Sequence, residues 1–345
     1  MRNSDMFFKI QFSRIETAMR SDKFLQRMKG CKFDIDHFHW IVTSNRIGID
    51  LQIGGTRIYF SYRNLDNEIG NPVRKLNGKY LFFKLHEKTS KSDGNRCIQW
   101  EFDLRTESVE NRMEMLKETT KYLKEFLTIK HYNLRFDLKE LKIQDLFIWE
   151  HTKKFNNLDI SEGRRSLELS PEDLKFILEE LKAEIRSLKI GVNDFEYEKP
   201  IQGKYLNIEN MKWITTKCLM GPDLVKMYGV GTSKNAINLN EIIKNWLNGG
   251  SLHLRSISCV YEGSLEDLFE GLNATESMFS AQDITKLSDN FLDNGRDIRR
   301  TTDRHLAIIM FSKGKRSVQF LTWHPDYVKD MRPETCQKLR NIHMI

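Results

Sequence analysis

The chain has few cysteines and prolines and no long hydrophobic run. Its five cysteines, in 345 residues, lie tens of residues apart without a CxxC pair, which argues against the common zinc and redox motifs. Scattered thiols of this kind are typical of the reducing cytosol or nucleus. No segment reaches the roughly 18 consecutive apolar residues of a membrane helix, and the first residues do not form a signal peptide. The sequence predicts a cytoplasmic or nuclear protein with no membrane partner.

Catalytic signatures are absent as well. The sequence has no GxSxG elbow and no kinase set of glycine-rich loop, HRD and DFG. Residues 227–235 (MYGVGTSKN) lack the GxxxxGK[ST] spacing of a phosphate loop, so we predict a turn at Gly229, Gly231 and Lys234. The sequence therefore predicts neither an enzyme nor a bound cofactor.

One pair of histidines has the chemistry of metal ligands. His37 and His39 lie two residues apart, on one face of a predicted strand, with Asp34 and Asp36 close by. A metal site would need a third ligand from elsewhere in the chain, and the spacing is not that of HExxH. Strand histidines with polar neighbours are the favoured interpretation, and we predict no metal site.

Charges of both signs are mixed along the chain. The formal net charge of +7 would suit nucleic acid if the basic residues gathered on one face. They alternate with acids instead, as in ELKAEIR at residues 180–186, a pattern typical of solvated helix faces. The pattern argues against nucleic-acid binding, which stays an alternative.

Hydrophobic periodicity predicts an α/β protein that begins with an antiparallel β region, at residues 31–105. Three helix-then-strand units follow. We expect their helices at 109–127, from 170 onward and at 238–247, and their strands at 133–138, 188–192 and 252–260. Such units in series give parallel strands with helices on one face, so we expect an irregular leucine-rich-repeat-like helix/strand arrangement.

Local signals mark the ends of several elements. Ser170 is placed to cap the second helix with Pro171 in its first turn, and Gly249 follows the third helix. Three strand-like runs at 297–300, 305–311 and 317–323 predict a terminal hairpin. The tryptophans in apolar runs, Trp213, Trp246 and Trp323 among them, are predicted to be core residues.

Residues 213–260 carry a specific pattern. Trp213-Ile214-Thr215 is followed by Leu239-Asn240, Trp246 and Gly249 before a predicted strand. This pattern resembles the second type of F-box-associated domain of nematode F-box proteins. A second block, with Asp297, Arg299 and Trp323, is similar to another part of that domain, although Asp303-Arg304 stands where the family has Asp-Gly.

The resemblance covers most of residues 30–325 and implies an organisation for the chain. Residues 1–30 are similar only to the last helix of an F-box, 31–105 form the antiparallel β region, 106–325 the F-box-associated α/β domain, and 326–345 a tail. An F-box normally docks on a Skp-type adaptor of a cullin ubiquitin ligase. With only its last helix matched, the chain is interpreted as a truncated gene model or an F-box-less relative that binds the adaptor weakly or not at all.

The resemblance implies a non-enzymatic protein–protein interaction module that recognises substrates for SCF (cullin) ubiquitin ligation. The alternatives are an F-box-less binding protein with no ubiquitin link and a nucleic-acid-binding protein. No partner-binding residue is identified. The residues of the family signature are expected to be structural: Trp213, Thr215, Leu239, Asn240, Trp246, Gly249, Asp297, Arg299 and Trp323.

Overall fold

The computed structural model describes most of the chain after residue 31. The described residues are 32–53, 56–62, 72–76, 79–89, 96–104, 108–161, 166–231, 237–279, 295–312, 317–323 and 337, with only the backbone course for 62–104. The F-box-like helix expected within 1–30, Lys234, and the tail expected at 326–345, apart from residue 337, lie outside them. The chain divides into two compact units, Met1–Glu162 and Gly163–Ile345. Both are α/β and rich in strands.

Unit 1 contains two sheets. In the first, β1 (Phe33–Thr43), β2 (Arg46–Ile53) and β3 (Thr56–Tyr62) pair antiparallel in chain order. β1 also pairs in parallel with β7 (Leu127–Phe136), which pairs in parallel with β8 (Lys154–Ser161). The second sheet is antiparallel and consists of β4 (Pro72–Leu76), β5 (Lys79–Thr89) and β6 (Arg96–Leu104). The antiparallel pairing expected for 31–105 is confirmed, and β1 shares its sheet with strands that follow residue 105.

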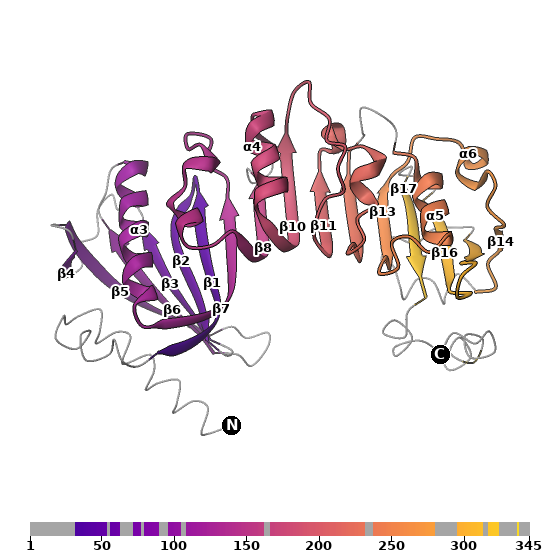
Figure 1. Ribbon diagram of the computed structural model, residues 1–345. Coiled ribbons are helices and arrows are strands. Elements are labelled where there is room, and N and C mark those ends of the chain that lie inside the picture. The colour runs from indigo at the N-terminus through magenta and orange to yellow at the C-terminus, as the bar shows by residue number, and fades with distance from the viewer. Residues whose placement is uncertain are drawn as a thin grey trace. The chain divides into compact units, whose positions relative to one another are not determined.

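Helix α3 (Val109–Lys124) covers one face of the first sheet (Figure 1). Its N-terminus is capped by the Ser108 side chain, and the indole Nε1 of Trp40 donates a buried hydrogen bond to Thr120 Oγ1 at 3.0 Å. The 3₁₀ turns η1 (Ile143–Asp145) and η2 (Phe147–Glu150) link β7 to β8. Strand β7 begins at Leu127 rather than at 133. The strand starts two residues after the helix C-cap, Glu125, and buried Phe126 and Leu127 pack on the same core as the apolar face of the helix. For this reason the helical pattern in the sequence appeared to extend to Leu127.

Unit 2 combines a parallel and an antiparallel series of strands. β9 (Leu167–Glu168), β10 (Lys182–Gly191), β11 (Tyr205–Glu209), β12 (Lys226–Val230) and β13 (Ser256–Val260) pair in parallel, in chain order. β13 then pairs antiparallel with β17 (Ser317–Thr322), followed by β16 (Leu306–Ser312), β15 (Arg296–Arg299) and β14 (Thr275–Glu276). The expected terminal hairpin is therefore confirmed as β16–β17.

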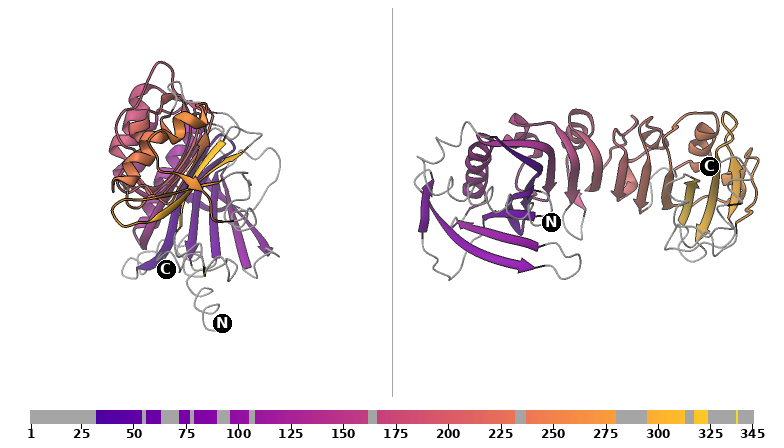
Figure 2. Two further views of the ribbon diagram at one scale, coloured as in Figure 1. Left: turned by 90° about the vertical axis from the view of Figure 1, so that its right-hand side faces the viewer. Right: turned by 90° about the horizontal axis from the view of Figure 1, so that it is seen from below.

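The helices of unit 2 lie on one side of its parallel strands (Figures 1 and 2). They are α4 (Pro171–Lys175), which runs into the π-helix η3 (Phe176–Glu180), α5 (Leu239–Leu247) and α6 (Leu265–Phe269), with 3₁₀ turns η4 (Met211–Trp213) and η5 (Thr216–Leu219). Ser170 caps α4 with Pro171 in the first turn, and Gly249 follows α5 with a φ of +87°. These three local predictions are confirmed.

The second predicted helix is too long. Its helical part ends at Glu180, and β10 begins at Lys182 rather than at 188. The ELKAEIR segment is therefore mostly strand, and Arg186 is 0% exposed rather than solvated. Its guanidinium donates hydrogen bonds to the carbonyl oxygens of Ile177 (2.9 Å), Leu181 (2.5 Å) and Gln202 (2.6 Å). Arg186 thus supplies donors at the end of the helix, where carbonyl groups otherwise lack partners.

Two smaller predictions near β12 and β13 are wrong. Gly229 lies in β12 rather than in a turn, and the reason for a glycine there is close packing, since an added Cβ would come within 2.4 Å of Met211 Sδ. Strand β13 begins at Ser256 rather than at 252, since Ser251 has a φ of +45° and its carbonyl accepts the Leu254 N–H in a turn. Gly231 follows β12 with a φ of +95°, as expected for a turn.

Candidate functional site

The face of unit 2 opposite its helices is lined by aligned outward-facing side chains. Along β11 and β12 the pattern alternates strictly, so that Leu206, Ile208 and Met227 are buried while Tyr205 and Tyr228 are 38% and 51% exposed. Because successive side chains of a strand point to opposite sides, the polar positions all face one way. We call this surface the open face.

Strand register arranges the open face into rows. One row crosses from Ile185 on β10 through Tyr205 and Lys226 to Ser256 on β13. The next row contains Ser187, Asn207, Tyr228, Ser258 and, on β17, Gln319. In parallel strands about 4.8 Å apart with residues i and i+2 about 6.8 Å apart, the two tyrosines are diagonal neighbours on adjacent strands.

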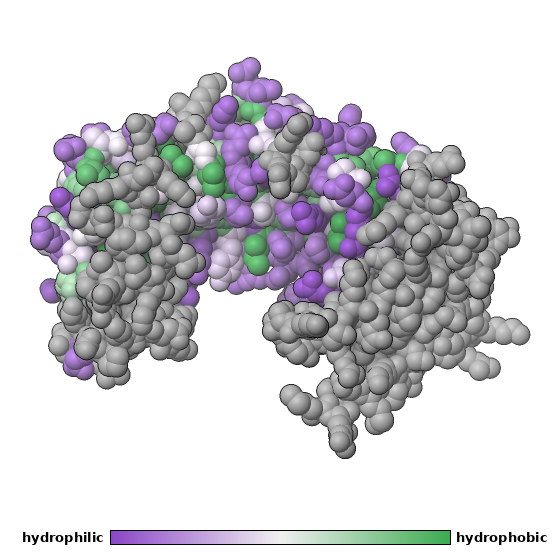
Figure 3. Space-filling view, turned by 180° about the vertical axis from the view of Figure 1, so that it is seen from behind, coloured by the Kyte–Doolittle hydropathy of each residue, from purple (hydrophilic) through white to green (hydrophobic). Residues whose placement is uncertain are grey.

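Small side chains on β13 leave a shallow groove on the open face. Ser256 and Ser258 lie between the larger side chains of β12 and β17, and the groove has a volume of about 310 Å³. Beyond it, Lys189 and Glu209 form an ion pair across β10 and β11 at 2.5 Å. Viewed from the side opposite the helices, the surface is mostly hydrophilic with separate hydrophobic patches (Figure 3). Such a mixed surface offers aromatic contact area and many hydrogen-bonding groups.

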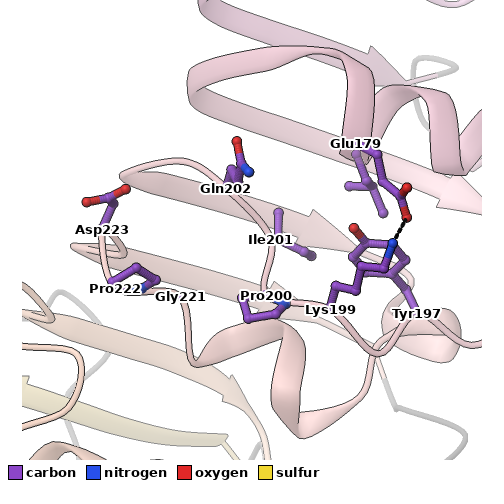
Figure 4. Close-up of a pocket in the computed structure, with 10 residues that line it drawn as sticks. Glu179, Tyr197, Lys199, Pro200, Ile201, Gln202, Gly221, Pro222 and Asp223 are labelled. Atoms are coloured by element: carbon purple, nitrogen blue, oxygen red, sulfur yellow. Dashed lines mark hydrogen bonds and ion pairs between the residues drawn. The ribbon is translucent and has the colours of Figure 1, made fainter.

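A second concave feature lies at the amino ends of β10, β11 and β12. This pocket, of about 640 Å³, is formed by the end of η3, the loop before β11 and the loop before β12. Its buried wall includes Leu178, Tyr197 and Ile201. In Figure 4, Glu179 and Lys199 lie at one side, joined by an ion pair of 2.9 Å, and Asp223 lies at the other. We call it the amino-end pocket.

Tyr197 is fixed in this pocket by the residues of the sequence signature. Its N–H donates to the Trp213 carbonyl at 2.8 Å, and its own carbonyl accepts the Thr215 hydroxyl at 2.8 Å. Burial, and to a lesser extent the charge of Glu179, raise the pKa of Tyr197 to about 12. Trp213 is itself 0% exposed and donates from Nε1 to the Ile190 carbonyl. The Trp213–Thr215 segment therefore positions the loop that lines the pocket.

Most other signature residues lie in the core of unit 2. Asn240 donates from Nδ2 to the carbonyls of Leu268 and Glu270, both at 2.8 Å, and so joins α5 to α6. Asp297 accepts hydrogen bonds from the Ser277 hydroxyl and the Met278 N–H, and burial raises its pKa. The other members divide by exposure: Leu239, Trp246 and Trp323 are buried, Gly249 is half-buried and Arg299 is exposed.

The histidine pair lies in unit 1, whereas the open face and the amino-end pocket both lie in unit 2. The His37 ring stacks on His131 with centroids 5.2 Å apart, and its Nδ1 is 3.3 Å from Asn133 Nδ2. Burial, with smaller contributions from three arginines, lowers the pKa of His39 to about 4. Asp36 is paired with Lys130 at 2.9 Å. Among the described residues, no three His, Cys, Asp or Glu side chains are grouped so as to hold a metal ion.

The residues of the open face and of the amino-end pocket were not identified from the sequence. The alternation in Tyr205–Glu209 and in Lys226–Val230 is the signal that was available for the face, since it places both tyrosines outward. Each run has only five residues, and short runs are weak evidence of a strand. The pocket is assembled from three segments distant in sequence, for which no motif exists.

No family model matches this sequence, and neither a curated protein nor a solved structure matches the chain.

Proposed function

We propose that this chain is a protein-binding module that recognises substrates for a cullin-type ubiquitin ligase, and that partners bind to the open face of unit 2. The observation that carries the proposal is the pair of exposed rings, Tyr205 and Tyr228, on adjacent parallel strands. Exposed tyrosines are enriched in protein interfaces, because a large rigid ring is combined with a hydroxyl group. The row of serine, asparagine and glutamine side chains beside them supplies hydrogen-bonding groups for specificity.

The arrangement of unit 2 supports an irregular leucine-rich-repeat-like fold as part of the same proposal. Four strands, β10 to β13, pair in parallel in chain order, with helices on the opposite side from the open face. Stacked strands of this kind present aligned side chains along an extended surface. The ubiquitin link rests on the resemblance of residues 213–260 and 297–323 to nematode F-box-associated domains, and catalysis of ubiquitin transfer is assigned to other subunits.

Site-specific cross-linking tests the open face. A photoreactive phenylalanine analogue placed at Tyr228 should cross-link a specific protein in cell extract, whereas the same group at the exposed helix position Lys175 should not. The captured protein is then purified, and its affinity is measured by calorimetry for the wild type and for Tyr205→Ala/Tyr228→Ala. Loss of two interface tyrosines should weaken binding by roughly tenfold or more. Equal affinities would reject the open face as the binding surface.

The ubiquitin link needs a separate measurement. If the chain recognises substrates for ligation, depletion of the protein should raise the level of its captured partner, and a cullin inhibitor should raise it equally. An unchanged partner level would instead support a binding protein with no ubiquitin link. Calorimetry with purified Skp-type adaptor addresses the other subunit contact: we expect weak or no binding by this chain, and submicromolar affinity would contradict that expectation.

A further inference from the structure

We infer that the amino-end pocket binds a basic side chain, specifically an arginine, of a partner protein. The pocket combines an apolar wall with carboxylates at its rim. Leu178, Ile201 and Tyr197 are 2%, 1% and 5% exposed and form the wall, while Glu179 and Asp223 stand at opposite sides (Figure 4). Long basic side chains fit such a site, because their aliphatic stem packs on apolar surface and their charged head reaches the carboxylates.

The charge of the lining complements a cation. The lining residues include two carboxylates, Glu179 and Asp223, and one lysine, Lys199, in a chain whose formal net charge is +7. Lys204, which follows the lining segment in sequence, is paired with Glu184 outside the pocket. The buried Arg186 lies close behind the pocket, but three carbonyl oxygens surround its guanidinium and offset its charge. A phosphate or carboxylate ligand would instead face Glu179 and Asp223.

Lys199 shows how a cation occupies this site. Its ammonium group lies 2.9 Å from Glu179 Oε1 (Figure 4). The Lys199 side chain is 68% exposed, so this pair is solvated and contributes little to stability. An incoming guanidinium can displace it at small cost. Arginine is preferred over lysine as the ligand, because its planar group can form two parallel hydrogen bonds with one carboxylate.

The amino-end pocket shares no lining residue with the groove of the open face. Each site can therefore be changed by substitutions that leave the lining residues of the other in place. The inference of arginine binding rests on neither the open face nor the ubiquitin link.

Methyl NMR of the full chain tests the inference with two probes of nearly equal shape. The protein, labelled at isoleucine and leucine methyl groups, is titrated with N-acetyl-L-arginine N-methylamide and, separately, with its neutral citrulline counterpart. We expect the arginine compound to shift the methyl signals of Ile201 and Leu178, and the citrulline compound to leave them in place. Equal shifts with both compounds, or no shift with arginine, would overturn the proposal.

Variants of the charged residues then test which side chains contribute to arginine binding. Glu179→Gln/Asp223→Asn should weaken arginine binding about fivefold, as expected for two solvated pairs, whereas Glu172→Gln/Glu266→Gln, which changes two exposed carboxylates elsewhere, should not. Lys199→Met removes the internal competitor and should tighten binding. A double variant that binds as well as the wild type would contradict the role of the carboxylates, and unchanged affinity of Lys199→Met would contradict the overlap of the two cations at Glu179. All variants carry surface changes, and unaltered signals from the remaining methyl groups report that they are folded.

Discussion

The guanidinium carbon of Arg300 lies 4.8 Å from the centre of the Trp246 ring. The same guanidinium donates to the Asp303 carboxylate from Nε at 2.8 Å and from Nη2 at 2.6 Å. Next to it, Thr301 donates from its backbone N–H and its hydroxyl to the Leu247 carbonyl, at the end of α5. These contacts bind the turn before β16 to helix α5, so the terminal hairpin packs against this helix.

Trp246 is central to this packing, and its truncation should destabilise unit 2. The ring is 0% exposed and packs edge-to-face on Phe320, with centroids 5.2 Å apart. Trp246→Ala should lower the free energy of unfolding by about 3–5 kcal/mol, because a large buried ring is replaced by a cavity. Urea denaturation followed by circular dichroism measures the change. Tyr228→Ala, at a position 51% exposed, is the control and should cost less than about 0.5 kcal/mol. A Trp246→Ala protein as stable as the parent would show that the core is misassigned.

The turn after Asp303 contains a backbone conformation that glycine would adopt more easily. Arg304 has a φ of +60° and is exposed. This is the position at which the resembled family carries glycine. The left-handed conformation costs a residue other than glycine about 1–2 kcal/mol. Glycine avoids this cost, but it raises the entropy of the unfolded chain, which offsets part of the gain in stability. Arg304→Gly should therefore raise the free energy of unfolding by roughly 0.5–1 kcal/mol.

Thermal melts of two matched variants check this prediction. Arg299→Gly makes the same change of side chain at an exposed position within strand β15. There, glycine brings no relief of strain and should destabilise by about 0.5–1 kcal/mol. Opposite signs for the two variants support the left-handed turn at Arg304, and a destabilised Arg304→Gly would contradict it.

The features that sequence predicted well are those specified locally. Helix α5 carries its own signals: Asn238 caps its N-terminus by accepting from the Glu241 N–H, and Gly249 closes it. The core position of Trp213, Trp246 and Trp323 follows from their apolar neighbours. By contrast, β11 and β12 are five residues long and gain their hydrogen bonds from strands on either side. Their presence depends on the sheet rather than on the segment, and so does the open face that they form.

Arg186 shows why the middle of unit 2 was misinterpreted. In sequence, ELKAEIR has the mixed charges of an exposed helix, and nothing within it indicates that one arginine is buried. The carbonyl groups that satisfy Arg186 come from Ile177, Leu181 and Gln202, of which the last lies in the loop between β10 and β11. A charge compensated by tertiary contacts cannot be identified from periodicity. The amino-end pocket could not be predicted from the sequence for the same reason, because its walls come from three separate segments.

His39 should make unit 1 less stable as the pH falls. Burial is the main cause that lowers its pKa to about 4, and Arg135, Arg46 and Arg57 add to the effect. Since an unfolded histidine has a pKa of about 6.5, the unfolded state takes up the proton first. The contribution of neutral His39 is complete above about pH 6.5 and is lost as the pH falls toward 4.

Comparison with His39→Gln isolates this effect. Asp50, opposite His39 in the strand register, has a pKa raised to about 6, mainly by burial, and titrates in the same range. The difference in the free energy of unfolding between the wild type and His39→Gln removes most of the Asp50 contribution. Between about pH 7 and pH 4, the free energy of unfolding of the wild type should fall relative to that of His39→Gln by on the order of 2 kcal/mol, measured by urea denaturation. Parallel pH profiles would indicate that folding does not lower the pKa of His39.

Arg186 should not be replaceable by lysine, although both carry one positive charge. The guanidinium is 0% exposed, and its three donors point to three different carbonyl oxygens, on η3, at its C-cap and in the loop before β11. A lysine ammonium places all its donors on one atom, so it cannot bridge these groups. Burial already lowers the pKa of Arg186 to about 10, and a lysine there is more easily deprotonated.

Arg186→Lys should therefore lower the free energy of unfolding by about 2–4 kcal/mol, because at least one buried carbonyl loses its donor and the charge is left poorly compensated. Arg299→Lys, at an exposed position on β15, is the matched control and should change stability by less than about 0.5 kcal/mol. Urea denaturation of both variants gives the comparison. Hydrogen exchange adds a local readout, since the amides of η3 should lose protection in Arg186→Lys before those of α5. If the two variants are equally stable, the three hydrogen bonds of Arg186 do not stabilise the end of η3.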